Sequence, residues 1–417
     1  MKPTEKTKKN SSKVSSRLSL GERVPKLRFP GFEGEWESKK FGSLICETNN
    51  RTTKENEDIL LSAAIEGMFL NSELFDHQRG ISNKGYKKIS RNTLILSTQN
   101  LHLGNANVNL RFEHGIVSPA YKTYDIIGCN HYLLSHWIKS EKAKKFFYDA
   151  TTVGASLCRR NVEWETLYEQ TLVLPSLDEQ NHLANFLNLL IARVAAQRKL
   201  VELLKKHKRG LSSALFSGKV RIATNAKWRT YRLGDIVRRV TRKNGKATDI
   251  PLTISAQHGL IDQREFFSKA VASADMSGYY LLKQGEFAYN RSSSGEYPFG
   301  SIKKLERYHQ GAVSTLYICF ETLGDKDDAE FLKWYFDSFA WHREIGMICA
   351  EGARNHGLLN VPTDGFFDTK HILPSDKDER KKIASLMALA DARCECAETE
   401  LARLMAMKSG LLQQMFV

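Results

Sequence analysis

Two long stretches of the chain decide its organisation: LDEQNHLANFLNLLIARVAAQRKLVELLKKHKRGLSSALFS at 177–217 and KDERKKIASLMALADARCECAETELARLMAMKSGLLQQMFV at 377–417. They are offset by 200 residues, and eleven of their positions are identical. The same breaker precedes each copy, as Leu-Pro-Ser at 174–176 and again at 373–375. Self-similarity of this kind indicates an internal repeat, so the residues before each copy are expected to correspond as well.

The segments before these stretches do correspond. A W-x4-F-G motif beginning at Trp36 returns as W-x4-L-G beginning at Trp228, and GIVSPAY at 115–121 returns as GAVSTLY at 311–317. The landmarks keep their order, which a duplication of one globular unit followed by one long helix explains. Short β-type runs alternate with helical pieces in both units. Each unit is therefore expected to be an α+β domain, and the chain a pseudo-two-fold internal repeat.

Within the two long stretches, apolar residues recur at alternating steps of four and three, the heptad spacing of helices that pair with each other. Both seams are interrupted at the same places, so they suit pairing in a fixed register. About forty residues at 1.5 Å each make a helix ~60 Å long. The helix-pairing residues expected from this spacing are Leu183, Leu187, Leu190, Val194, Val201, Leu204, Ile383, Met387, Cys394, Leu401 and Leu404.

The repeat divides the chain into six expected segments. They are a disordered basic tail at 1–24, a first globular domain at 25–176, a spacer helix at 177–217, a linker at 218–227, a second globular domain at 228–375 and a second spacer helix at 376–417.

Composition points to a polyanionic partner. The 417 residues carry 62 Lys and Arg against 47 Asp and Glu, a formal net charge of +15. Such a surface favours association with nucleic acid, although a merely solubilising charge is the alternative. The seven cysteines lack the paired spacing of a zinc site, which predicts a cytoplasmic location and no metal site. Neither a signal-peptide core nor a run of about 18 apolar residues occurs, so no membrane segment is expected.

Catalytic motifs are missing from the sequence. There is no H-E-x-x-H, no phosphate-binding G-x-x-x-x-G-K-[ST], no G-x-S-x-G and no dinucleotide-binding glycine pattern. The Asn-Pro-Pro-Tyr or Asp-Pro-Pro-Tyr tetrapeptide of amino-methyltransferases is missing too. Scattered Asp and Glu residues leave a metal-dependent nuclease site as an alternative. We expect no catalytic residue in this chain.

Polar loops at matched places in both copies are the candidate DNA contacts. One pair follows the central strand, at 97–109 and 290–300, and a second pair precedes the long helices, at 151–161 and 350–360. Asn and Gln can bond adenine edges, Arg can bond guanine, and Ser or Thr can bond bases or phosphates. For any single residue an ordinary surface role is the alternative. The candidates are Thr98, Gln99, Asn100, His102, Asn105, Arg159, Arg160, Asn290, Arg291, Ser292, Ser293, Arg354, Asn355 and His356.

These residues resemble the specificity subunits of type I restriction-modification enzymes. PKLRFPGFEGEW at 25–36 is similar to the opening of that family, and LPSLDEQ at 174–180 and LPSDKDER at 373–380 are similar to its paired helix starts. The resemblance covers the chain from about residue 25 to its end. Arg380 departs from the pattern, because Gln is common there.

The resemblance implies two target-recognition domains, each reading one half of a split DNA sequence. Two antiparallel helices would serve as the spacer and as a docking surface for two modification subunits. Those partners would bring S-adenosylmethionine and methylate adenine, and restriction subunits would bring ATP, Mg²⁺ and the cutting activity. The chain itself would bind double-stranded DNA, bind no cofactor and have no catalytic centre.

The repeat agrees with this implication on physical grounds, because two domains that share landmarks but differ in their loops would read an asymmetric, bipartite target. Two alternatives remain open. One is an autonomous nuclease or methyltransferase with fused recognition domains, and the other is a coiled-coil scaffold whose basic charge is incidental.

Overall fold

The computed structural model describes residues 23–75, 82–156, 159–222, 227–255, 258–266, 275–295, 297–349, 357 and 359–416, with the backbone alone at 154–156, 159 and 266. Of the expected tail at 1–24, all but the last two residues lie outside the described residues. The chain divides into two compact units. The first runs to Gln197 and also includes the chain from Glu400 onwards, and the second spans Arg198–Thr399.

The first unit is built on a four-stranded antiparallel sheet of order β2-β9-β6-β7. These strands are Ile45–Thr48, Tyr121–Ile126, Leu94–Ser97 and Ala106–Val108. Four two-stranded pairs surround it: β1 (Glu37–Lys40) with β12 (Thr171–Leu174), β3 (Leu61–Ala64) with β4 (Gly67–Leu70), β5 (Lys87–Ser90) with β8 (His114–Val117), and β10 (Thr151–Ser156) with β11 (Arg159–Val162). The helices between them are α1 (Asn71–Leu74), α2 (His131–Trp137), α3 (Glu141–Asp149) and α4 (Trp164–Glu169), with short 3₁₀ turns at Phe41–Leu44 and Leu101–Leu103.

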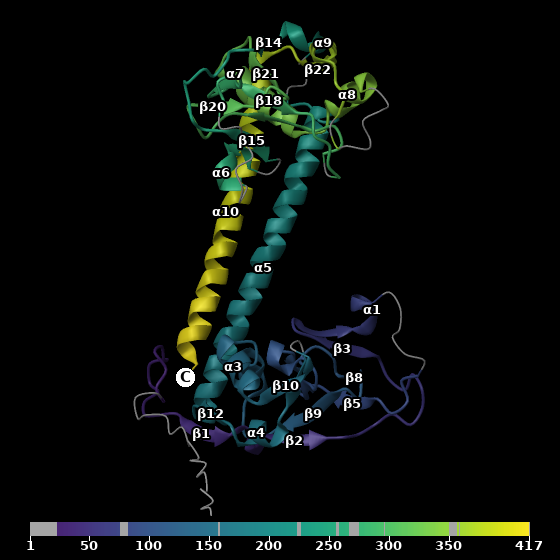
Figure 1. Cartoon of the computed structure of the whole chain (residues 1–417), viewed down its shortest axis with the longest axis vertical. Coiled ribbons are helices and arrows are strands. Elements are labelled where there is room, and N and C mark those ends of the chain that lie inside the picture. The colour runs from purple at the N-terminus through teal and green to yellow at the C-terminus, as the bar shows by residue number, and fades with distance from the viewer. Residues whose placement is uncertain are drawn as a thin grey trace, which may run out of the picture. The chain divides into compact units, whose positions relative to one another are not determined.

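The second unit repeats the four-stranded sheet and, in its described residues, three of these four pairs. Its four-stranded sheet has the order β14-β21-β18-β19, made of Val237–Val240, Ile318–Thr322, Phe287–Asn290 and Ser301–Lys304. Its pairs are β13 (Trp228–Arg232) with β22 (Lys370–Pro374), β15 (Leu252–Ser255) with β16 (Gly259–Asp262), and β17 (Tyr280–Lys283) with β20 (Gln310–Val313). Its helices are α6 (Gln263–Phe266), α7 (Lys326–Asp337), α8 (His342–Ile348) and α9 (Thr363–Asp368), with a 3₁₀ turn at Leu233–Asp235. The predicted duplication and the α+β class are confirmed (Figure 1).

Close packing explains why one landmark of the repeat is a glycine. Gly115 begins GIVSPAY on β8, and a Cβ there would lie 2.4 Å from a methyl carbon of Leu61. Gly311 begins GAVSTLY on β20, and a Cβ there would lie 2.3 Å from a methyl carbon of Leu252. Both leucines are buried core residues of the neighbouring hairpin strand. Only glycine lets the strand and the hairpin approach this closely, so both copies keep it.

The two long helices are continuous. Helix α5 spans Leu177–Phe216 and α10 spans Lys377–Met415. Their halves pack antiparallel in each unit: Arg193 pairs with Glu400 at 3.3 Å in the first unit, and Lys208 pairs with Asp391 in the second. None of the described helices has the length and apolar character needed to cross a membrane.

Most of the expected seam is buried, but its ends pack on the globular domains. Leu183 and Leu187 belong to the core of the first domain, and Ile383 and Met387 belong to the core of the second. The buried seam residues are Leu183, Leu187, Leu190, Val201, Ile383, Met387, Cys394 and Leu404, while Val194, Leu204 and Leu401 are half-buried. Each helix therefore begins as part of a domain core and continues as part of the helix pair.

The segment that leads into the first domain, residues 25–36, is here called the lead-in segment. Its Leu27 amide donates to the carbonyl of Gln414 near the end of α10, within the first unit. In the second unit the amide of Val220 donates in the same way to the carbonyl of Ala214, near the end of α5. The residues KLRF at 26–29 thus correspond to KVRI at 219–222 in both sequence and contact.

Candidate nucleic-acid interface

The loops that follow β6 and β18 are built alike. The Ser97 hydroxyl, at the end of β6, accepts the backbone amide of Gln99 at 3.3 Å. The Asn290 side-chain carbonyl, at the matched end of β18, accepts the backbone amide of Ser292 at 3.0 Å. A polar side chain that bonds two residues ahead fixes a tight turn. Both turns leave the side chain two residues on, Gln99 or Ser292, exposed to solvent.

The first residue of each loop is an anchor. Thr98 donates its hydroxyl to the carbonyl of Ala120 at 2.8 Å. Arg291 donates Nε and Nη2 to the carbonyl of Leu316, at 3.2 and 2.9 Å, and Nη1 to the carbonyl of Val361 at 3.2 Å. Ala120 and Leu316 occupy matched positions of the repeated GxVSxxY motif. Thr98 and Arg291 therefore tie their loops to equivalent points of the two domains.

The other candidates near these loops differ in exposure. Asn100 is exposed, whereas Asn105 is buried and donates its side-chain amide to the carbonyl of Ala63 at 3.2 Å. His102 is half-buried in the 3₁₀ turn, and burial together with the nearby positive charge of Arg160 lowers its pKa. Ser293 is half-buried, and its backbone amide donates to the carbonyl of Gly357.

The expected loop at 151–161 contains a β-hairpin, β10 paired with β11. Arg160 on β11 donates to the hydroxyl and the carbonyl of Thr151, at 2.7 and 2.8 Å, and its guanidinium lies 4.1 Å from the ring centre of Tyr148. The side chain of Arg159 lies outside the described residues. So do Arg354, Asn355 and His356 of the matched region in the second unit.

Sequence reasoning missed a lysine that is exposed along its stem but whose ammonium group fixes the β3–β4 hairpin against the main sheet. Lys139 donates to the carbonyls of Ile65 and Ala106, at 2.7 and 2.8 Å, and to the side-chain carbonyl of Asn107 at 2.7 Å. Burial lowers its pKa to about 8. Asn107 in turn donates to the carbonyl of Ala64. The only sequence signal was a lysine directly after an apolar helix end, which is common on surfaces.

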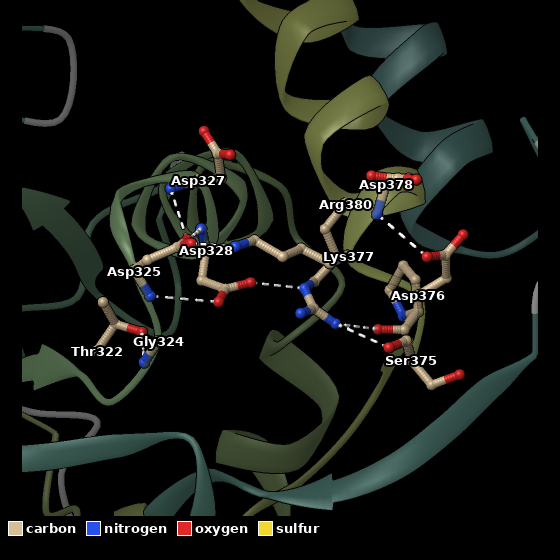
Figure 2. A network of polar contacts seen from close by, with 11 residues as sticks. Thr322, Gly324, Asp325, Asp327, Asp328, Ser375, Asp376, Lys377, Asp378 and Arg380 are labelled. Atoms are coloured by element: carbon tan, nitrogen blue, oxygen red, sulfur yellow. Dashed lines mark hydrogen bonds and ion pairs between the residues drawn. The ribbon is translucent and has the colours of Figure 1, made fainter.

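A network of charges joins helix α7 to the start of α10 in the second unit. Figure 2 shows Arg380, whose Nε lies 2.7 Å from a carboxylate oxygen of Asp328, and Lys377, which pairs with Asp325. Lys381 pairs with Asp327 at 3.1 Å. Asp325 caps α7 by accepting two of its backbone amides, and its hydrogen bond with Lys377 lowers the pKa of that carboxyl.

The first unit makes the same junction from neutral amides. The Gln180 side chain accepts the backbone amide of Asn130 at 2.8 Å, and the Asn130 side chain donates to Asn181 at 2.7 Å. Gln180 also donates to the carbonyl of Pro175, as Arg380 does to the carbonyl of Pro374, each at 2.9 Å. The departure of Arg380 from the usual Gln is thus matched by aspartates at the start of α7, and the position keeps its role.

Among the residues that the structure describes, no cluster of three or more His, Cys, Asp or Glu side chains could hold a metal ion. The described cysteines are free thiols, and burial raises the pKa of Cys129 and of Cys319 to about 12. These two thiols are packed as small apolar groups.

Comparison with protein-family models and with curated proteins gives no match. Solved structures do match. The S subunit of a type I restriction-modification system from M. genitalium superimposes with a TM-score of 0.53 at 16% identity, covering 94% of this chain and 99% of that one. The HsdS subunit from Thermoanaerobacter tengcongensis gives 0.51 at 14% identity, covering 91% and 96%. This chain has the fold of a type I restriction-modification S subunit.

A third solved structure, described as concerning complex assembly and conformational transition of the type I R-M system, gives a TM-score of 0.52 at 13% identity, covering 91% of this chain and 96% of that one. The fold that the sequence resemblance implied is confirmed across almost the whole chain. Gln99 and Ser292 are exposed residues at matched positions of the two central loops.

Proposed function

We propose that this chain is the DNA sequence-specificity subunit of a type I restriction-modification complex. It would read an asymmetric, bipartite target with its two domains and dock modification subunits that methylate adenine. The observation that carries the proposal is the pair of loops after β6 and β18. They share one anchoring geometry but present different side chains, Gln99 in one and Ser292 in the other. Two recognition loops with the same anchoring turn but different exposed side chains suit a DNA target whose two halves differ.

Two of the candidate arginines already have hydrogen-bond partners inside the protein. Arg160 and Arg291 have their guanidinium groups bonded within their own domains. Exposed side chains that receive no hydrogen bond from the described part of the chain, such as those of Gln99 and Asn100, are free to meet base edges. A Gln or Asn side-chain amide can bond an adenine in two places.

Partner docking has a matched candidate on the long helices. Leu189 on α5 and Leu389 on α10 are the same residue at the same repeat position, and they are 71% and 61% exposed. A large exposed apolar side chain kept in both copies favours two equivalent contacts with two copies of one partner. On this proposal S-adenosylmethionine would be bound by the modification subunits, ATP and Mg²⁺ by restriction subunits, and none of them by this chain.

The test is to map methylated adenines in DNA from cells that express this chain with its partner subunits. The expected result is a split motif with two different halves and a fixed gap. A Gln99→Ala variant should relax one half alone, and a Ser292→Ala variant should act only on the other. A palindromic motif, or relaxation of both halves by one variant, would contradict the proposal.

A further inference from the structure

A positively charged side chain stands at the same place beside the central sheet in both units. Arg51 follows the end of β2 by three residues, and Lys243 follows the end of β14 by three residues. Nη1 of Arg51 donates to the carbonyl of Gly85 at 3.1 Å, and Nζ of Lys243 donates to the carbonyl of Gly278 at 2.9 Å. Gly85 and Gly278 are matched in the repeat. The two cations therefore occupy equivalent positions and make the same contact.

Neither cation is neutralised within the described part of the chain. Both side chains are exposed, and neither forms an ion pair with a carboxylate there. Arg51 also donates Nε to the side-chain carbonyl of Asn49 at 3.0 Å, and Lys243 lies 4.5 Å from the ring centre of Tyr280. A glycine carbonyl needs only one N–H donor, charged or not. The residue type has changed between the copies while the positive charge has been kept, so the charge has a use beyond this contact.

The surroundings of both cations are positive as well. Lys87 on β5 lies opposite Arg51 and is buried. Burial lowers the pKa of Lys87, and the charges of Arg51 and Lys122 lower it further. The carboxylate of Glu47 acts on Lys87 in the opposite direction, but it is already paired with Lys122 at 3.0 Å. In the second unit the exposed Arg239 stands at the position of Glu47. An anion beside Arg51 or Lys243 would therefore meet an excess of positive charge.

Paired strands connect each cation to a recognition loop. In the first unit Arg51 lies opposite Lys87, and Lys87 lies opposite Val117. Val117 precedes Ala120 by three residues, and the Ala120 carbonyl holds Thr98 at the start of the loop. The second unit repeats this path through Lys243, Tyr280, Val313, Leu316 and Arg291.

The spacing along this path suits a duplex. Neighbouring strands lie ~4.8 Å apart, so two strand steps place each cation ~10 Å from the strand that leads into the anchoring turn. The major groove of B-DNA is ~12 Å wide. A phosphate at the edge of that groove thus lies about as far from the bases inside it as each cation lies from its loop.

We propose that Arg51 and Lys243 each bind a backbone phosphate of the DNA duplex, one in each half-site, and so fix the register in which the neighbouring loop meets the bases. The duplex as ligand rests on the proposed function, whereas phosphate as the contacted group rests on the two matched cations that the chain leaves without a carboxylate. Phosphate contacts position a protein on DNA and carry no sequence information. Arg51 and Lys243 are therefore positioning residues, distinct from the exposed Gln99 and Ser292 that face the bases in the proposed function.

The test measures DNA binding by this chain assembled with its modification subunits, over a range of salt concentrations. Two duplexes of equal length are used, one with the mapped bipartite target and one of unrelated sequence. Arg51→Gln and Lys243→Gln each keep an amide donor for the glycine carbonyl but remove the charge. Losing one phosphate contact should reduce the slope of log K against log salt by about 0.9, and so weaken binding of both duplexes about eightfold at ~0.1 M salt. Gln99→Ala should instead weaken binding of the target duplex alone.

Two control variants separate a phosphate contact from net charge and from folding. Lys199→Gln removes the same charge from an exposed lysine in the middle of α5 and should leave the slope unchanged. Arg51→Lys keeps the charge and should keep the slope. An unchanged slope in both glutamine variants, a loss that Lys199→Gln reproduces, or a loss confined to the target duplex overturns the proposal. A complex that methylates a bipartite target but gives one of these results leaves the proposed function standing, whereas a complex that binds neither duplex refutes both.

Discussion

The junction between α7 and α10 offers a sharp test of how the two domains hold their long helices. Arg380 and Asp328 approach to 2.7 Å, and their side chains are 21% and 19% exposed. Replacing Arg380 with Gln copies the first unit but leaves Asp328 without its cation. Two unit charges whose centres lie ~4 Å apart near a protein surface gain about 4 kcal/mol of Coulomb energy. Partial exposure and the remaining hydrogen bonds reduce the loss to about 2 kcal/mol, roughly a 30-fold change in local opening.

Hydrogen exchange followed by mass spectrometry measures this change directly. Amides in the peptide 326–337, which covers α7, should exchange about 30-fold faster in Arg380→Gln, because local opening of the helix governs their exchange. The peptide 131–137, which covers α2 in the first unit, is the internal control and should not change. Added salt should speed exchange in α7 and leave α2 unaffected, since the α2 junction is made of neutral amides.

The double variant Arg380→Gln, Asp328→Asn completes the cycle. It leaves no charge without a partner, and the introduced glutamine can keep the hydrogen bond to Pro374, as Gln180 does to Pro175. Exchange over 326–337 should then return to within a few-fold of the unaltered chain. If the effects of Arg380→Gln and Asp328→Asn on exchange, each measured alone, simply add in the double variant, the two residues do not act as a pair, and the account of the junction is wrong.

Three further outcomes are expected. Burial lowers the pKa of His371 to about 4, so acidification below pH ~6.5 favours the unfolded chain. The free energy of unfolding of the second unit should fall by about 2 kcal/mol at pH 5. The variant His371→Leu, which copies the matched Leu172, should remove most of this pH dependence in urea unfolding curves. Leu204→Asp should disrupt the helix pair and abolish complex assembly in size-exclusion chromatography, with the exposed Leu203→Asp as control, and an unaltered complex would refute the seam. Inserting a few residues near Ala195 should change the gap between the methylated half-sites, and an unchanged gap would show that the helices do not set the spacing.

The duplicated fold could be predicted because its landmarks answer physical constraints that survive divergence. Gly115 and Gly311 persist because a side chain there would collide with a core leucine. The Leu-Pro-Ser breakers persist because each ends the last strand of a domain and precedes a long helix. The seam could be located from heptad spacing alone. Which of its residues serve a domain core was not predictable, because Leu183 and Leu187 have the same periodicity whether they face a helix or a sheet.

The candidate site was predictable by region and less so by residue. Loop composition located both central loops, but it gave Thr98 and Arg291 the same weight as Gln99 and Ser292. Thr98 and Arg291 bond carbonyls more than twenty residues away, a contact that residue type does not reveal. Lys139 could not be predicted from the sequence, because a single lysine looks like an ordinary surface residue. Its role follows only from its three hydrogen-bond acceptors, which the fold brings together.

The starts of α5 and α10 show why the two copies are more similar in sequence along the long helices than in the segments before them. Glu179 and Glu379 are both buried, but their partners differ. Glu179 accepts hydrogen bonds from Arg28. Glu379 instead accepts the indole N–H of Trp228 at 3.3 Å, and Arg221, the counterpart of Arg28, stacks on the ring of that tryptophan. In each unit this exchange leaves a buried polar atom without a partner among the described residues, the indole nitrogen of Trp36 in the first and one oxygen of Glu379 in the second. Such a defect costs about 1–3 kcal/mol. The acidic group is retained at both starts, where it also complements the helix dipole, while its partner was free to change. Both copies therefore keep the acidic residue at the helix start, whereas the segments that supply its surroundings, the lead-in segment and the linker at 218–227, differ in sequence.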